Sequence, residues 1–330
     1  MNSFGRLFRI SIYGESHGES VGIVVDGVKP GISLSEDDFT LDLARRKSGG
    51  LGTTPRIEAD KVLIESGVFN GFTTGAPILL RFLNQNKISK DYSDLVTHPR
   101  PSHADFTAME KYDSFNDYRG GGHFSGRLTL GIVAAGVIAK KMIPFVEFKT
   151  TLINLGGVTN PKKFDEVLKR TVDENDSVGG ILKLEAKNVP VGLGEPYFDS
   201  LESEISHLLF SIGGVKGVEF GIGFDGVGLK GSSFNDLIED GYGKTITNHN
   251  GGINGGISNG NPIEVKVFMK PTPSIGKIQE TFDFKEGKVL PLEIKGRHDA
   301  AIILRGMIVC EAALAIALAD ASLVYNSYKK

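Results

Sequence analysis

The chain has 330 residues, of which 40% are hydrophobic and 23% are charged, and its formal net charge is −3. This length supplies a core that needs no disulfide, and the single cysteine, Cys310, excludes an intrachain disulfide and a cysteine-only metal cluster. The small negative charge provides no overall basic field for nucleic acid or for an anionic membrane. We therefore expect a cytoplasmic protein with no nucleic-acid partner, no membrane partner and no bound metal, in which any anion is recognised locally.

The first distinctive stretch is Tyr-Gly-Glu-Ser-His-Gly at residues 13–18, between two apolar runs at 8–12 and 21–28. Glycine is used where the backbone turns tightly or approaches a ligand, and histidine has the side-chain pKa nearest to neutrality. The combination is typical of a functional site, with His17 as its reactive group. It is equally typical of a tight turn with an exposed histidine, and the stretch alone leaves both interpretations open.

A helix is predicted to begin after Ser35, which forms a capping-box pattern with Asp38. The helix ends in three cations at 45–47, directly before the glycine-rich residues 49–52. The helix dipole favours cations at this end by roughly 0.3–1 kcal/mol each, so ordinary capping explains them. Three cations beside a glycine loop are also typical of an anion-binding site. The sequence leaves both interpretations open, helix capping and anion binding.

A glycine triplet precedes the next long helix. Residues 118–127 read Tyr-Arg-Gly-Gly-Gly-His-Phe-Ser-Gly-Arg, and the apolar spacing after Ser125 predicts a helix to about Met142. A glycine loop that leads into a serine-capped helix directs backbone N–H groups towards an anion. The sequence therefore predicts a phosphate site here.

Strands and helices are mixed without a strict β-α-β order, and no linker marks a domain boundary. We therefore predict an α/β protein of the layered α+β type, with one catalytic domain over residues 1–323 and a flexible tail at 324–330. The apolar run at 300–323 is interrupted by three charges, so we interpret it as a buried helix rather than a membrane span. The other predicted elements are strands at 21–28, 61–68, 77–83, 146–155, 180–186, 215–220 and 263–269, and helices from Ser102 or His103 towards Lys111, from Asn160, and from a capping box of Asp199 with Glu202 to Ile212.

Two further features need an explanation. Residues 241–261 are rich in glycine and asparagine, too polar to bury themselves and too long for an idle turn, so they are a candidate lid or cofactor-binding loop. Glu311 stands inside the apolar C-terminal run, and a buried carboxylate must be paired. Arg305 or another arginine is the expected partner.

Several motifs in a fixed order resemble the chorismate synthase family. The three main ones are Gly-Glu-Ser-His-Gly at 14–18, Gly-His-Phe-Ser-Gly-Arg-Leu-Thr at 122–129, and Arg-His-Asp at 297–299 with Glu-Ala at 311–312. Supporting matches are Ser-His-Ala-Asp at 102–105, Asp-Tyr-Arg-Gly-Gly-Gly at 117–122 and Lys-Pro-Thr at 270–272. The resemblance runs from about residue 4 to residue 323.

This resemblance implies a homotetrameric, cytoplasmic lyase of the shikimate pathway. Such enzymes eliminate phosphate from 5-enolpyruvylshikimate 3-phosphate to give chorismate, in aromatic amino acid biosynthesis, and they need reduced FMN although the reaction has no net redox change. The implied fold is a sandwich of helices between antiparallel sheets with internal pseudo-symmetry. The resemblance does not tell whether the protein reduces its own flavin with NADPH or depends on an outside reductant.

The resemblance also implies roles for individual residues. His17 is expected near the departing phosphate, His103 at the reduced flavin, and Asp299 as the carboxylate that relays a proton from flavin N5. The substrate's carboxylates and phosphate are expected to bind arginines, namely Arg46, Arg127 and Arg297, with Arg119 and Arg45 as further candidates. The implied flavin-binding residues are His123, Phe124, Ser125, Gly213, Gly214, Gly255, Lys270, Pro271, Thr272, Pro273, Ser274 and Arg297.

The chain departs from the family's pattern at three places. Residues 49–52 supply no arginine where the family commonly has one more, and Lys47 or Arg56 is the candidate replacement. The residues His123 and Gly126 stand where arginine and alanine are frequent, and Ala300 replaces a proline. Two alternatives follow: a non-catalytic protein that binds nucleotides or RNA through its arginine and glycine loops, and an inactive scaffold that lost activity with the missing arginine.

Overall fold

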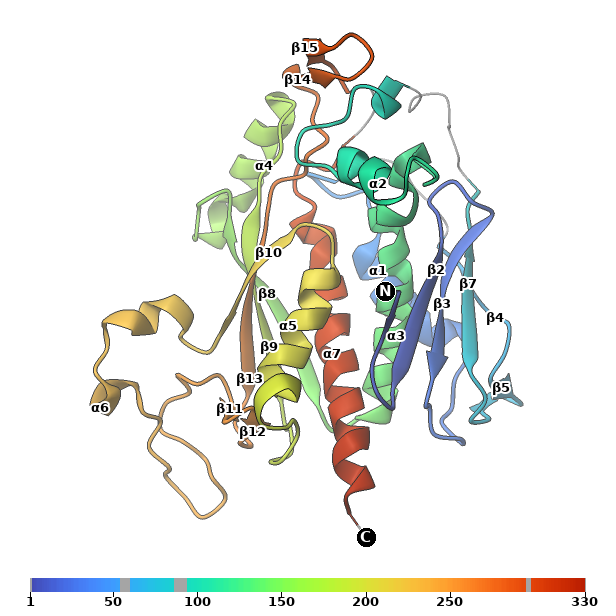
Figure 1. Ribbon diagram of the computed structural model, residues 1–330. Helices are drawn as coiled ribbons and strands as arrows, with labels where there is room; N and C mark the ends of the chain where they lie inside the picture. Colours follow the sequence, from blue (N-terminus) through green and yellow to red (C-terminus); the bar gives the residue numbers. More distant parts are fainter. Residues whose placement is uncertain (1, 54–59, 86–93, 295–297, 330) are drawn as a thin grey trace.

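The structure, a computed structural model, describes residues 2–53, 60–85, 94–294 and 298–329. Within these residues, two antiparallel sheets enclose a layer of helices (Figure 1). This arrangement confirms the predicted layered fold and the sandwich of helices between antiparallel sheets. One core cluster contains buried residues from both sheets and from the helices between them.

The first sheet has the strand order β1-β2-β3-β7-β4. It is formed by β1 (Ser3–Phe4), β2 (Arg9–Gly14), β3 (Ser20–Asp26), β4 (Val62–Ile64) and β7 (Ile78–Leu83). In β3 the side chains of Val21, Ile23 and Val25 are fully buried, because alternate residues of a strand face the helix layer. The turn between β2 and β3 carries residues 15–19 and therefore His17.

The second sheet has the order β10-β13-β9-β8. Its strands are β8 (Glu147–Leu155), β9 (Gly180–Lys187), β10 (Val215–Phe220) and β13 (Ile263–Met269). Leu182, Leu184 and Ala186 of β9 alternate as fully buried residues. The pattern is the same as in β3, so each sheet buries one face against the helices.

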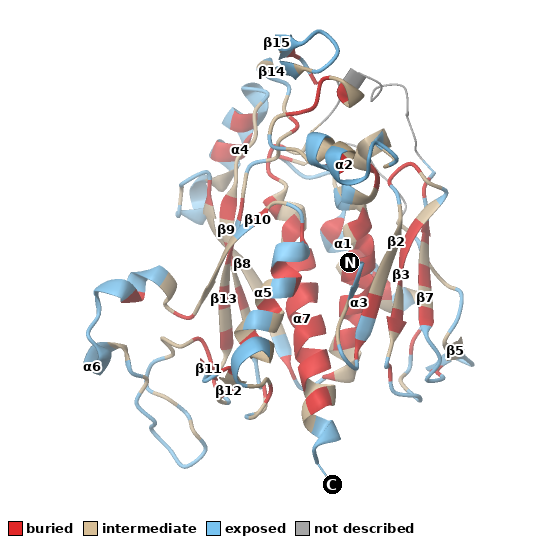
Figure 2. Cartoon of the chain, in the orientation of Figure 1, coloured by how far each residue is buried: buried red, intermediate tan, exposed pale blue. Residues whose placement is uncertain are grey.

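The helix layer contains α1 (Thr40–Arg46), α3 (Thr129–Met142), α5 (Leu201–Ser211) and α7 (Ile303–Ser327). Figure 2 shows that α3 and α7 are buried along most of their length. They pack closely, since a Cβ added to Gly136 of α3 would collide with Ala312 of α7. The helix α7 is long and apolar enough to cross a membrane, but 83% of its most apolar window is buried in this core, as expected for a core helix.

The two sheets and the helices form an internal repeat. An N-terminal half runs β2, β3, α1, β4, β7, α3, and a C-terminal half runs β8, β9, α5, β10, β13, α7. The sheet orders correspond strand for strand, as β2-β3-β7-β4 and β8-β9-β13-β10. This correspondence confirms the pseudo-symmetry that the family resemblance implied.

The remaining elements are insertions into this repeat. Between β4 and β7 there is only a short hairpin, whereas between β10 and β13 the chain makes a long arm at 221–262 that projects from the body (Figure 1). The inserted elements are β5 (Val68–Phe69), β6 (Phe72–Thr73), α2 (Asp105–Lys111), α4 (Phe164–Asp173), α6 (Gly231–Phe234), β11 (Ile253–Asn254), β12 (Ile257–Ser258), β14 (Gln279–Asp283) and β15 (Lys288–Leu292), together with short 3-10 turns such as Glu36–Phe39 before α1 and Gly126–Leu128 before α3.

Three helix ends test the sequence predictions. The capping box at Ser35 is confirmed, since its N–H donates to the Asp38 carboxylate at 2.7 Å. The predicted box at Asp199 is wrong by one residue, because Ser200 caps α5 and accepts from the N–H of Ser203. Residues 324–327 are not a frayed tail, because α7 continues to Ser327 and buries Val324.

Candidate active site

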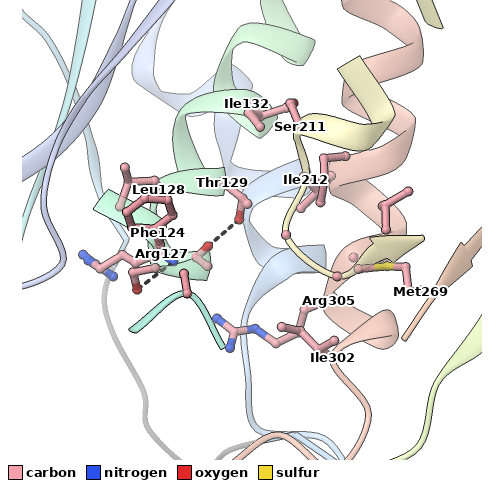
Figure 3. A pocket seen from close by; sticks show the side chains of 18 of the residues that line it. Phe124, Arg127, Leu128, Thr129, Ile132, Ser211, Ile212, Met269, Ile302 and Arg305 are labelled. Carbon is pink, nitrogen blue, oxygen red and sulfur yellow. Dashed lines mark hydrogen bonds between the residues drawn. The ribbon is translucent and has the colours of Figure 1, made fainter. Parts of the chain in front are cut away.

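A cavity of about 890 Å³ lies where the starts of α3 and α7 meet the ends of α1 and α5 (Figure 3). Ligand cavities commonly have 300–1,000 Å³, so this one is large enough for a cofactor and a small substrate. Its wall contains both acids and cations. These lining residues include Arg46, Lys47, Asp60, His103, His123, Arg127, Lys216, Lys270, Asp299 and Arg305.

The two glycine motifs near the N-terminus meet at one side of the cavity. The N–H of Ser16 donates to the carbonyl of Gly122 at 3.1 Å, and Nδ1 of His123 donates to the carbonyl of Gly14 at 2.8 Å. Gly120 has a φ of +60°, and a Cβ there would lie 2.5 Å from Cδ2 of His17. Only glycine therefore fits over the imidazole, which explains a glycine triplet at this point.

His17 lies directly behind this wall. Its side chain is 5% exposed, and the neighbouring Ser16 and Gly120 line the cavity. The structure thus brings His17 to the edge of the cavity, under the loop that precedes α3. The interpretation of residues 13–18 as a turn with an exposed histidine is wrong, because the ring is buried.

Two of the predicted arginines line the cavity and converge on Asp60. Arg127 donates to the Asp60 carboxylate at 3.0 Å and to the carbonyl of Leu83 at 3.2 Å. Arg46 is 3% exposed and lies 3.6 Å from the same carboxylate. Its guanidinium also donates to Thr129 Oγ1 at 2.9 Å and to the Gly126 carbonyl at 2.8 Å, so these contacts fix it against the start of α3.

Two more of the predicted arginines, Arg45 and Arg119, do not line the cavity. Arg45 makes two 2.7 Å hydrogen bonds to Glu311, which explains the buried acid in α7 and makes Arg45, not Arg305, its arginine partner. Arg119 makes bonds of 2.8 and 2.9 Å to Asp117, and these bonds hold the pKa of Asp117 below its ordinary value. In this structure both cations therefore serve ion pairs outside the cavity, while Arg297 lies outside the described residues.

His103 is held by a neighbouring carboxylate. Its Nδ1 lies 2.6 Å from Asp105, and Arg100 donates to the same carboxylate at 2.7 Å. Burial alone would raise the pKa of Asp105, but the hydrogen bonds from Arg100 and His103 lower it well below its ordinary value. The ionised Asp105 fixes the Nδ1–H of the ring, so Nε2 is the nitrogen left to act in the cavity.

Asp299 enters the cavity just before α7. It does not cap that helix, whose N-cap is Ile302. Its carboxylate accepts a 2.9 Å hydrogen bond from Arg305 Nη1. An acid of the C-terminal half thus faces the arginines and histidines of the N-terminal half.

Most of the implied flavin-binding residues come together along the cavity. His123, Phe124 and Ser125 belong to the loop before α3, Gly213 and Gly214 follow α5, and residues 270–274 follow β13. Arg100 donates to Ser274 at 2.9 Å, which joins the last group to His103. Gly255 is not with them: it lies in the turn between β11 and β12 on the arm and does not line this cavity.

Sequence reasoning missed several lining residues. Arg305 was considered only as a partner for Glu311, yet its guanidinium reaches from α7 towards the segment that carries Phe124 and Arg127 (Figure 3). Asp60, Lys216 and Ser48 also line the cavity. The only available signal was the position of Arg305 six residues after Asp299 in the sequence.

The comparisons with known proteins agree over almost the whole chain. A family model described as chorismate synthase matches residues 8–323. A chorismate synthase of Chitinophaga pinensis is 54% identical over 321 residues, which cover 97% of this chain and 96% of the relative. One from Dehalococcoides mccartyi is 44% identical over 351 residues, with 98% and 96% covered.

A solved structure leads to the same family. A crystal structure of chorismate synthase matches with a TM-score of 0.73 at 28% identity, covering 97% of this chain and 93% of the other. The region matched by the family model contains both halves of the repeat. Of the lining residues that the structure describes, it leaves out only Asn2, Ser3 and Phe4. The chain therefore belongs to the chorismate synthase family.

Proposed function

We propose that the cavity at the starts of α3 and α7 is the active site in which this protein converts 5-enolpyruvylshikimate 3-phosphate to chorismate and phosphate. The chain is a carbon–oxygen lyase of the shikimate pathway, and its cofactor is reduced FMN. The observation that carries the proposal is the meeting of His103, Asp299, the buried Arg46 and the partly buried Arg127 in one cavity. The motifs behind the family resemblance contain three of these residues, and Arg46 lies just before the glycine-rich residues 49–52.

The cavity suits a flavin as well as a substrate. No atom lies within 4 Å of the Cβ position of Gly213, so there is open space beside this backbone. At the other side, Lys270 donates to the carbonyl of Ser102 at 2.7 Å, and burial together with the nearby Lys216 lowers the pKa of Lys270. We propose that 123–125, 213–214 and 270–274 hold FMN, whose reduced form supplies electron density to the substrate.

The anionic groups of the substrate need cations that are already oriented. Arg46 and Arg127 are fixed by several hydrogen bonds each, so little side-chain entropy is lost when an anion binds them. Lys47 and Ser48 line the cavity after Arg46, where the family commonly has another arginine. We propose that Lys47 takes over this anion contact.

Three side chains are proposed to donate, hold or accept protons in the reaction. His17, as an imidazolium, is proposed to neutralise the charge that develops on the departing phosphate, an effect of ~10²–10⁴ in rate for a positioned acid. His103 presents Nε2 because Asp105 holds Nδ1. Asp299 is proposed to take up the proton that the elimination removes, from the opposite wall of the cavity.

We extend the proposal to a cytoplasmic homotetramer. The arm at 221–262 supports association, because several of its apolar side chains are exposed although the arm is internally hydrogen-bonded. Phe224, Ile238 and Tyr242 are 77%, 72% and 91% exposed. Light scattering on the purified protein tests the tetramer, and a monomer at micromolar concentration would contradict it.

An anaerobic assay tests the proposed function. Purified protein is mixed with chemically reduced FMN and 5-enolpyruvylshikimate 3-phosphate, while phosphate release and chorismate absorbance are followed together. Both products are expected in equal amounts, and only with reduced flavin. Bound flavin without either product would indicate an inactive scaffold instead.

A further inference from the structure

Arg305 makes two hydrogen bonds that join separate parts of the cavity wall. Its Nη1 donates to the Asp299 carboxylate at 2.9 Å, and its Nε donates to the backbone carbonyl of Arg46 at 3.1 Å. The side chain is 23% exposed. It is one of the residues that line the cavity (Figure 3). One guanidinium thus connects the segment before α7 with the end of α1.

Both partners of Arg305 matter for the site. Asp299 lies three residues before the N-cap Ile302, so it precedes the regular helix and is not fixed by a helical backbone. Arg46 carries a guanidinium that is itself bonded to Thr129 and Gly126. A planar guanidinium with several N–H groups can hold a carboxylate and a carbonyl in one geometry, which a lysine cannot.

We propose that Arg305 is a positioning residue for the reaction: it fixes the Asp299 carboxylate relative to the anion-binding end of α1. This inference rests on the proposed function, in which Asp299 takes up a proton while Arg46 holds the substrate. A displacement of about 1 Å between a reacting group and a bound substrate can cost ~10²-fold in rate. Arg305 therefore sets the distance between the proton acceptor and the bound anion.

A double-mutant cycle tests this role. Arg305→Gln and Asp299→Asn are each expected to lower kcat, by ~30-fold and by ~10³-fold, with a smaller change in KM. If Arg305 acts through Asp299, the double variant will be within ~3-fold of Asp299→Asn alone. Multiplied effects in the double variant would overturn the proposal, because Arg305 would then act independently of Asp299.

Two further variants distinguish the positioning role of Arg305 from the effect of its charge and from a general effect of losing an ion pair. Arg305→Lys keeps the charge but cannot repeat both bonds, so its kcat is expected to lie between wild type and Arg305→Gln. The matched control is Arg9→Gln, which breaks another arginine–aspartate pair of 2.9 Å, to Asp26, on the exposed edge of β2. The control is expected to keep kcat within ~2-fold of wild type, because exposed ion pairs contribute little.

A crystal structure of Arg305→Gln without cofactor gives a readout that does not depend on turnover. The proposal expects an intact fold, an unchanged affinity for FMN in solution, and an Asp299 carboxylate turned away from its wild-type position. An Asp299 that keeps its position in this variant would contradict the inference. Failure of the wild-type protein to turn over would instead refute the proposed function, so the two failures are distinguishable.

Discussion

The two halves of the chain build corresponding elements but give them different chemistry. In the N-terminal half, the end of α1 and the turn before α3 contribute Arg46 and Arg127, and the β2–β3 turn places the buried His17 behind the cavity wall. In the C-terminal half, the end of α5 and the residues after it contribute His207, Ser211 and the glycines at 213–214, and the residues before α7 contribute Asp299. In the proposed function, the two arginines that bind the substrate's anionic groups therefore come from one half, and the proton-accepting carboxylate comes from the other.

The comparison shows how a symmetric framework makes an asymmetric site. Corresponding helix starts, those of α3 and α7, lie beside one cavity, so both backbone dipoles favour negative charge there. The insertions then differ: 65–77 is a short connection, whereas its counterpart 221–262 is the exposed arm. The framework fixes where the cavity lies, and the loops decide which groups enter it.

The largest expected effect is on kcat, and it distinguishes the proposed role of the C-terminal half from that of the N-terminal half. Asp299→Asn should lower kcat by ~10³-fold with little change in KM, because a positioned proton acceptor contributes ~10²–10⁴ in rate. Arg127→Gln should instead raise KM by ~10-fold or more, since it removes a cation from the anion site. Steady-state kinetics under anaerobic conditions measure both. The reverse pattern would break the proposed division between the halves.

The next effect concerns the contact that joins the halves. Glu311 of α7 is bound by Arg45 of α1 and by Lys140 of α3, each at 2.7 Å. Glu311→Gln leaves these cations without their buried acid, so unfolding free energy should fall by about 3 kcal/mol. Denaturant titration measures it. The matched pair is Lys140→Gln against Lys141→Gln, of which only the first touches Glu311. Equal losses from the two lysine variants would contradict this account.

The same carboxylate predicts a pH dependence. Burial alone would raise the pKa of Glu311, but the bonds from Arg45 and Lys140 lower it from its ordinary 4.5 to about 2. Because the folded pKa is the lower one, Glu311 stabilises the fold fully above pH about 4.5 and loses this contribution as the pH falls towards about 2. Glu311→Gln should flatten the stability curve in that window. An unchanged curve would show that other acids dominate it.

A smaller effect compares two glycines with positive φ, one in each half. Gly120→Ala should lower turnover by ~10-fold or more, because the new Cβ meets His17. Gly157→Ala, in the connection between β8 and β9, has a φ of +87° but nothing within 4 Å of its Cβ position. Both variants carry a similar backbone strain of about 1–2 kcal/mol, so only the first should affect kcat. Equal kcat losses would mean that strain alone is responsible.

The smallest effect is expected at Cys310, which is buried in the first third of α7. Burial raises the pKa of its thiol to about 12. The native protein at pH 8 should therefore react with a thiol reagent only after unfolding, and Cys310→Ala should leave kcat within ~2-fold of wild type. Rapid labelling of the folded protein would show that α7 is more accessible than this packing allows.

Local signals in the sequence predicted much of the framework and part of the site. Ser35 with Asp38 marked a helix start, and the glycine triplet at 120–122 marked the loop that covers His17. Alternating apolar residues marked β9 and β13 as strands. These features depend on residues close together in the chain, so a pattern over a few positions is sufficient.

Contacts between distant residues could not be predicted in this way. Arg45 and Arg46 are neighbours in sequence, yet one binds Glu311 and the other lines the cavity, because successive side chains of α1 point to different sides. The link from Arg305 to Arg46 spans 259 positions. Gly255 matched a family pattern, but the arm carries it to a turn that does not line the cavity.

The most direct test of the central claim is a crystal structure of the protein with FMN and 5-enolpyruvylshikimate 3-phosphate bound. We expect both molecules in the cavity at the starts of α3 and α7. The substrate's phosphate should lie on the side of His17 and Arg46, and the flavin should lie along 213–214 and 270–274. Asp299 should then lie within hydrogen-bond reach of the flavin or the substrate. Flavin or substrate bound elsewhere, with this cavity holding neither, would contradict the account.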